Sequence, residues 1–302
     1  TALGVQAGDA IEHNPARRRV LASAAAFIGV AAGVGRLANA GGNDTAAGPV
    51  SEAVADRLQQ ADAQALDIDG DVPGLVSEIG EFYNVDSAEF DPEVAADDWS
   101  MTITGEVGDD VTVSYDELTT MPTEHRYVTL RCVGEDLNGE KLDNAVWTGT
   151  PIKPLLDEAD PEGECDCAML RAEDDYFVQF PVDALEDAFL VWEMNGQPLP
   201  QSHGHPVRVL VPGHWGETNV KWLSEIELLD EEMDGYWEQR GWHGTGPVNT
   251  VAKLWSTTTL DSGAIEVAGH AYAGTRGIER VEVSTDGGST WQDAELSEPL
   301  PG

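Results

Sequence analysis

Alternating apolar and polar positions predict short strands in the middle of the chain. Met101 and Ile103 alternate with threonines, and Val111 and Val113 repeat the pattern a few residues later. The segment 114–118 then has the serine and glutamate spacing that begins a short helix. Strands and short helices continue in this way without a long amphipathic helix or a glycine-rich dinucleotide fingerprint. The pattern therefore favours an α+β domain, which we place over residues 81–240, and not a Rossmann or barrel fold.

The last part of the chain shows the period-two pattern of a second β-rich domain. Ile265 and Val267, then Val281 and Val283, alternate with polar residues, and the segment 285–289 has the composition of a hairpin turn. This pattern resembles the start of an immunoglobulin-like β-sandwich. Such a sandwich needs about 100 residues and seven strands, so we expect residues 247–302 to form a truncated one.

The first 40 residues have the pattern of an export signal or a membrane anchor. Three arginines, Arg17–Arg18–Arg19, precede an apolar run from Val20 to Gly35, and Ala38–Asn39–Ala40 follows as an Ala-x-Ala sequence. The run is short for a bilayer span, which favours a twin-arginine export signal, and an anchor is the alternative. Either way the arginines stay inside, so we expect the protein at the extracytoplasmic face of the cell membrane.

Residues 41–80 are rich in Gly, Ala, Asp and Gln and contain few large apolar side chains. This composition predicts an acidic flexible linker with one weak helix over residues 50–65.

The overall charge excludes one class of partner and indicates an environment. The chain contains 56 Asp and Glu against 16 Lys and Arg, which gives a net charge of −40. Binding to the phosphate backbone of nucleic acids is therefore excluded. Molar salt screens repulsion between carboxylates over a few ångströms, so we expect a high-salt source such as a halophilic archaeon.

Cysteine usage isolates one candidate metal ligand. Three cysteines cannot make a disulfide framework, and the sequence Cys165–Asp166–Cys167 fits core packing, a short bridge or an adventitious metal site. Cys132 stands apart, after the β-branched segment 127–131. A thiol in this position is either buried packing or a soft metal ligand.

Hydrogen-bond donors are concentrated in two neighbouring segments, 202–213 and 218–223. His203, Arg208 and Lys221 supply imidazole, guanidinium and ammonium groups, which suit a polyphosphate or an oxyanion. Ion pairs with the many carboxylates are the structural alternative. His203 and His205 lack a third ligand at suitable spacing, which argues against zinc.

Several motifs in the same order are similar to those of the sulfite oxidase family of molybdopterin-dependent oxidoreductases. Residues 99–237 resemble its molybdopterin domain, and the chain from Pro247 onward resembles its dimerisation domain. The motifs are Leu130–Arg131–Cys132, Trp147–Thr148–Gly149, His203–Gly204 to Arg208, Pro212–Gly213, Val220–Lys221–Trp222 and the terminal Val281 to Gly288 with Trp291.

The resemblance implies a molybdenum centre with molybdopterin as its cofactor. Cys132 would be the protein thiolate on molybdenum, and Tyr176 would donate a hydrogen bond near the metal. The remaining residues would hold the pterin and its phosphate: Arg131, His203, Arg208, Thr218, Asn219 and Lys221. Arg208 is also a catalytic candidate.

One departure from the family concerns the substrate. Where sulfite oxidases carry an arginine that meets the anionic substrate, the best-aligned residue is Asn84, which resembles the bacterial sulfoxide-reducing branch. Loss of a charge-assisted bond typically costs about 1.5 to 3 kcal/mol.

The activity expected from the resemblance is two-electron oxygen-atom transfer on sulfite or a related small sulfur oxyanion. A methionine sulfoxide type of reductase and a cofactor-free surface binding module are the alternatives. The chain has no Cys-x-x-Cys-His haem motif. We therefore expect a separate electron carrier or a membrane redox partner, and the dimerisation resemblance implies a homodimer.

Overall fold

The structure, a computed structural model, describes residues 2–4, 49–87, 90–243 and 246–301. The predicted export signal or anchor lies outside the described residues, except for the short strand β1 (Ala2–Gly4), which pairs in parallel with β14. None of the described helices is long and apolar enough to cross a bilayer.

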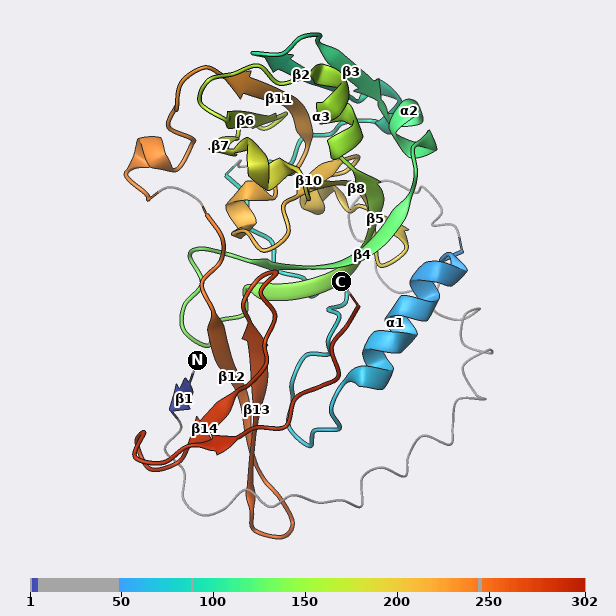
Figure 1. The fold of residues 1–302 in the computed structure, drawn as a ribbon. Coiled ribbons are helices and arrows are strands. Elements are labelled where there is room, and N and C mark those ends of the chain that lie inside the picture. Colours follow the sequence, from blue (N-terminus) through green and yellow to red (C-terminus); the bar gives the residue numbers. More distant parts are fainter. Residues whose placement is uncertain (1, 5–48, 88–89, 244–245, 302) are drawn as a thin grey trace.

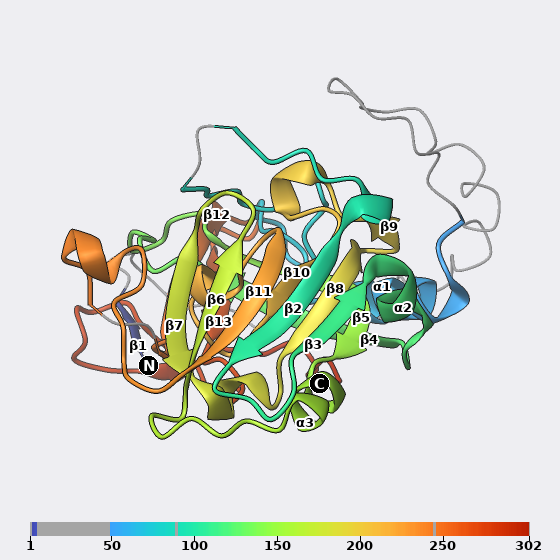
Figure 2. The same ribbon diagram turned by 90° about the horizontal axis from the view of Figure 1, so that it is seen from above.

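Two sheets form the body of the predicted α+β domain. The first has the strand order β3-β2-β11-β6-β7, which is visible from above in Figure 2. The second has the order β10-β8-β5-β4, and β9 pairs with β8. The strands of the first sheet are β2 (Ser100–Gly105), β3 (Val111–Ser114), β6 (Cys167–Ala172), β7 (Phe177–Pro181) and β11 (Leu223–Leu229). Those of the second are β4 (Glu124–Arg131), β5 (Leu142–Pro151), β8 (Phe189–Met194), β9 (Gln197–Pro198) and β10 (Arg208–Leu210).

The main core lies between these two sheets, and a second core lies on the outer face of the second sheet. Leu190 and Trp192 of β8 pack into the main core, whereas Phe189 and Val191 pack into the second core. This division follows from the alternation of side chains along a strand. The second core also contains Phe82, so it continues into the segment before the first strand of the domain.

The described chain is mostly sheet, and its helices are few and short. Strands and short helices alternate as predicted, but helix makes up less of the domain than the term α+β suggests. The α-helices are α1 (Glu52–Gln64), α2 (Tyr115–Thr120) and α3 (Lys153–Ala159), and 3₁₀ turns lie at Ala96–Asp98, Val182–Leu185, Gln201–His203, Gly216–Thr218 and Glu238–Arg240. Ser114 and Glu117 form the expected capping box at the start of α2. Cys165 and Cys167 form a disulfide, which decides between the alternatives left open for this pair.

Residues 49–80 are packed against the domain, so the prediction of a flexible linker is wrong for them. The expected helix is present as α1, which buries Val54 and Ala61 on one face. Further along, the Ser77 amide donates to the Asn144 carbonyl on β5 at 2.8 Å. Side chains of Tyr127, Asn144 and Asn195 also donate to backbone carbonyls of this segment, so polar contacts hold it where large apolar side chains are few.

The β-rich region from residue 247 consists of two strand pairs, and an immunoglobulin-like sandwich is not confirmed. β12 (Val251–Thr259) pairs with β13 (Ile265–Tyr272), and β14 (Glu282–Ser284) pairs with β15 (Gln292–Asp293). Figure 1 shows the β12–β13 hairpin below β4 and β5. The Tyr272 hydroxyl donates to the Thr129 carbonyl of β4 at 3.1 Å. The two parts of the chain are therefore in direct contact.

A buried ion cluster joins the loop after β4 to β12. The Lys253 ammonium lies 2.6 Å from Glu135, and each of these side chains is 1% exposed. The Arg131 guanidinium lies 3.0 Å from the other oxygen of the same carboxylate. We call Arg131, Glu135 and Lys253 the buried ion cluster. It fixes the loop that begins at Cys132.

Candidate active site

Cys132 is the first residue after β4 and lies in the wall of a cavity of about 320 Å³. Val128 and Leu130 of β4 are buried in the second core. Strand alternation places Cys132 on the same face and Arg131 on the opposite one. The Cys132 thiol is half-buried and is not part of the disulfide.

The cavity brings together six of the residues that the sequence predicted for the site: Cys132, Tyr176, His203, Arg208, Asn219 and Lys221. Asn84, Arg131 and Thr218 do not line it. Arg131 faces away into the buried ion cluster. Thr218 is fully buried, and its hydroxyl donates to the Trp215 carbonyl at 2.9 Å. The predicted roles of these three residues in the cavity therefore lack support from the geometry.

Arg208 provides a buried guanidinium at one end of the site. It is 3% exposed and donates to the carbonyls of His203 at 3.3 Å and Asn219 at 2.6 Å. Burial lowers the pKa of Arg208 to about 10, so it stays charged at neutral pH. Among the described residues its buried Nε has no hydrogen-bond partner. A buried donor without a partner is costly, so this atom is suited to a ligand.

His203 is neutral in this site. It is 4% exposed, and burial, with the nearby Arg208 and Lys221 charges, lowers its pKa to about 3. The ring lies edge-on to Phe82, with centroids 5.6 Å apart, and makes a hydrogen bond to the Ile79 backbone. His203 can therefore offer a neutral imidazole to a bound molecule, but no charge.

Lys221 is held by acceptors around it. Its ammonium bonds to the side chains of Asp86 and Asn84 and donates to the Ser202 carbonyl at 2.6 Å. Burial is the main cause that lowers the pKa of Lys221 to about 8. Asn84 is exposed, and its amide also donates to Asp86 at 2.7 Å. Asn84 thus supports Lys221 from outside the cavity, and its predicted place against the substrate is not observed.

We predict that Arg208→Lys weakens cofactor retention about tenfold or more. A lysine keeps the positive charge but has no planar guanidinium. The guanidinium of Arg208 donates to two carbonyls and leaves its Nε–H for a ligand, and one ammonium group cannot do both. The measurement is the molybdopterin content of purified protein after dialysis. Arg126→Lys, at a partly exposed guanidinium on β4, is the matched control and should retain the cofactor. Equal retention by both variants would contradict the prediction.

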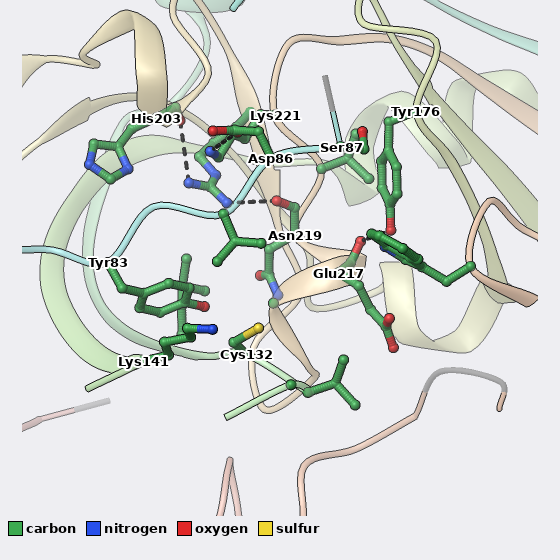
Figure 3. A pocket seen from close by; sticks show the side chains of 18 of the residues that line it. Tyr83, Asp86, Ser87, Cys132, Lys141, Tyr176, His203, Glu217, Asn219 and Lys221 are labelled. Carbon is green, nitrogen blue, oxygen red and sulfur yellow. Dashed lines mark hydrogen bonds and ion pairs between the residues drawn. The ribbon is translucent and has the colours of Figure 1, made fainter. Parts of the chain in front are cut away.

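Tyr176 and Glu217 form another wall of the cavity. The Tyr176 hydroxyl donates to the Glu217 carbonyl at 2.9 Å, and its pKa is raised, chiefly by burial. Burial, followed by the charge of Glu238, raises the pKa of the Glu217 carboxyl to about 7. In Figure 3 this pair lies apart from Cys132. The hydroxyl that was predicted to point to the metal is thus engaged with the protein backbone.

We predict that Glu217 makes the protein less stable as pH rises from about 4.5 to about 7. Its pKa is raised above the ordinary value of 4.5, so the folded state keeps a proton that the unfolded state has lost in this window. Glu217→Gln should therefore lose less thermal stability than the wild type between about pH 5 and about pH 8. Melting curves at fixed salt measure this difference. Parallel pH profiles would contradict the prediction.

Tyr83 is the aromatic residue beside Cys132, and the sequence did not indicate it. A Cβ on Gly216 would lie 2.7 Å from its hydroxyl, so glycine there makes room for the ring. Burial, then the Cys132 charge, raises the pKa of Tyr83. Figure 3 shows Tyr83 and Cys132 as neighbours, with Lys141 next to them. The sequence did contain a hint that was not used: the adjacent aromatic residues Phe82 and Tyr83, of which Phe82 is buried in the second core.

Two tryptophans from the segment after β11 complete the cavity and were also missed. Trp237 and Trp242 have ring centroids 5.3 Å apart. A Cβ on Gly134 would lie 3.9 Å from both the Trp242 ring and the Cys132 sulfur. Trp242 therefore lies on the side of the cavity where the thiol is, and Trp237 packs against it.

The residues in the cavity fit a molybdenum cofactor. A half-buried thiol in the cavity wall is the soft ligand that the metal takes. The unpartnered Nε of Arg208 and the Lys221 ammonium suit the polar pterin and an anionic phosphate. Within the described parts of the chain, no group of three His, Cys, Asp or Glu residues is placed to hold a metal ion by itself. The thiol would then be the protein's contribution to a metal that the cofactor also holds.

Comparisons with known proteins identify two domains in the chain. Residues 88–237 match the oxidoreductase molybdopterin binding domain, and residues 247–300 match the Mo-co oxidoreductase dimerisation domain. Mitochondrial sulfite oxidase of Rattus norvegicus is 30% identical over 253 residues, which are 68% of this chain and 46% of the rat protein. Sulfite oxidase of Arabidopsis thaliana is 26% identical over 252 residues, which are 65% of this chain and 64% of the plant protein.

A solved structure has the same fold. The crystal structure of the sulfane dehydrogenase SoxCD from Paracoccus pantotrophus superposes with a TM-score of 0.63 at 21% identity, over 78% of this chain and 67% of that chain. The chain spans less than half the length of the rat relative. The two domain matches and the sulfite oxidase relatives imply molybdopterin with molybdenum as the cofactor. On these matches, the chain belongs to the sulfite oxidase family of molybdopterin-dependent oxidoreductases.

Proposed function

We propose that the protein oxidises sulfite or a related small sulfur oxyanion by oxygen-atom transfer. The observation that carries the proposal is a cavity that joins a half-buried thiol, Cys132, to the buried donors Arg208 and His203 and to the half-buried Lys221. These donors would hold the pterin and its phosphate, and Cys132 would hold the metal. When bound, the molybdenum cofactor supplies the two-electron oxygen-atom transfer.

The proposed reaction balances with water as the source of oxygen. Sulfite and water give sulfate, two electrons and two protons, and the sulfur forms one new bond to oxygen. The electrons pass to a separate electron carrier. A partner of this kind is in keeping with the absence of a haem motif from the sequence.

The chain's own residues would position the substrate and limit water. Tyr83 keeps its proton at neutral pH, as an ordinary phenol does and as its raised pKa reinforces, and it is a hydrogen-bond donor beside Cys132. Trp237 and Trp242, which line the cavity in contact with each other, would narrow the access to the thiol. A donor and a restricted opening are what a small polar substrate requires.

The two alternatives receive less support. The sulfoxide alternative depended on Asn84, which does not line the cavity. The family match does not favour a cofactor-free binding module. We retain as proposals a homodimer, supported by the match to the dimerisation domain, and export from the cell of a high-salt organism, supported by the arginine triplet and the net charge.

The test is an activity assay on protein from a host that makes the cofactor. We expect about one molybdenum per chain and sulfite-dependent reduction of a one-electron artificial acceptor, with two equivalents reduced per sulfate formed. The same preparation is tested as a reductase with methionine sulfoxide and a reduced viologen dye. Loaded protein that reduces the sulfoxide and leaves sulfite unchanged would overturn the proposal.

A further inference from the structure

We propose that Lys141 is the residue that binds the anionic substrate, in the place of the arginine that the sequence lacks at Asn84. This inference rests on the proposed function and names the group that gives the cavity its preference for an anion. It follows from the position of Lys141, from the ion pairs and hydrogen bonds of the other cations, and from the charges on the other walls of the cavity.

The backbone holds Lys141 next to Cys132. The loop that starts at Cys132 closes at Lys141, where the Cys132 amide donates to the Lys141 carbonyl at 3.0 Å. The Lys141 amide in turn donates to Glu135 at 2.9 Å. Glu135 belongs to the buried ion cluster, so this end of the loop is anchored. The backbone of Lys141 is therefore held next to that of Cys132, from which its side chain starts.

The side chain enters the cavity beside the thiol. Lys141 lines the cavity with Cys132 and Tyr83. In the view of Figure 3, the Lys141 ammonium is drawn between the Tyr83 ring and the Cys132 sulfur. An oxyanion at this point would meet an ammonium and a protonated phenol together, and both are donors.

Lys141 is the one lysine of the chain without a carboxylate within ion-pair distance in the described structure. The chain has four lysines, and all four lie in described segments. Lys153 pairs with Asp157 at 2.6 Å, Lys221 pairs with Asp86, and Lys253 pairs with Glu135 at 2.6 Å. In a chain with 56 acidic residues, a lysine that keeps its charge available in a cavity is unusual.

The other cations of the cavity, Arg208 and Lys221, are the ones that would hold the cofactor, and protein groups already take up part of their hydrogen-bonding capacity. Arg208 donates to two backbone carbonyls, and Lys221 bonds to Asp86, Asn84 and a carbonyl. Three carboxylates lie elsewhere in the wall, namely Asp86, which is paired with Lys221, Asp174 and Glu217. An anion is therefore attracted towards Lys141 and repelled from the acidic wall, which places it near the thiol.

The test compares Lys141→Gln, Lys141→Arg and Lys153→Gln in the full chain loaded with cofactor. Lys153→Gln removes the same charge from an exposed pair on α3 and is the matched control. We expect Lys141→Gln to raise KM for sulfite about 10- to 100-fold with a smaller change in kcat, because a charge-assisted hydrogen bond is lost. Lys141→Arg should recover most of the affinity, and Lys153→Gln should match the wild type.

A second readout is independent of turnover. Isothermal titration with sulfate, the proposed product, should give a weaker Kd for Lys141→Gln by a similar factor, with unchanged molybdenum content. Unchanged sulfate affinity and unchanged KM in Lys141→Gln would overturn the role of Lys141. If wild-type protein oxidises no sulfur oxyanion while sulfate binding still depends on Lys141, the proposed reaction fails and the anion site stands.

Discussion

Cys132→Ser is expected to lower sulfite-dependent activity by at least about 100-fold, which exceeds the usual effect of a residue one step removed from a metal. A serine hydroxyl stays protonated at neutral pH and is a poor ligand for a soft metal site, whereas a thiolate is the ligand such a site takes. The Cys132 side chain is only half-buried, so the loss of activity should occur without loss of the fold. Activity, molybdenum content and the optical spectrum of the purified variant measure the effect.

The remaining cysteines provide the control for this substitution. A Cys165→Ser, Cys167→Ser double variant removes the disulfide, which lies at the start of β6 and outside the cavity wall. It should keep the spectrum and activity of the metal centre even where its thermal stability falls. A Cys132→Ser protein with wild-type spectrum and activity would show that Cys132 is not a metal ligand.

The alternation of apolar and polar residues predicted much of the fold. Met101 and Ile103 are buried on one face of β2, and the residues after 265 form β13, as the alternation predicted. The same rule applied to β4 places Cys132 on the face of Val128 and Leu130, which is the face that Phe82 covers. The sequence thus contained the information that puts the thiol beside the segment around Phe82.

What the sequence could not show depends on contacts between distant segments. Arg131 lies next to Cys132 in the sequence, but its guanidinium pairs with Glu135 and donates to the Asn249 carbonyl of the second region. The pairing of Cys132 with Lys141 is set by the length of a loop that has no regular pattern. Residue types alone therefore indicated the chemistry of the site, while the identity of several lining residues required the structure.

Lys253→Met is expected to destabilise the protein by about 3 to 5 kcal/mol, because it leaves the buried Glu135 carboxylate without its ammonium partner. Both side chains are 1% exposed, so water cannot replace the lost contact. Since Glu135 also holds Arg131 and the Lys141 amide, the loop that begins at Cys132 should loosen and molybdenum content should fall. Unfolding by urea at constant salt measures the change in free energy.

Two further variants separate the buried contact from the mere loss of a lysine. Lys153→Met breaks an exposed pair and should cost no more than about 1 kcal/mol. Adding Glu135→Gln to Lys253→Met removes the uncompensated charge, so the double variant should recover part of the lost stability, although Arg131 then lacks its own partner. If Lys253→Met unfolds at the same urea concentration as Lys153→Met, the buried ion cluster does not hold the two regions together. A large loss that the second substitution partly reverses would instead show that the β-rich region supports the Cys132 loop through this one carboxylate.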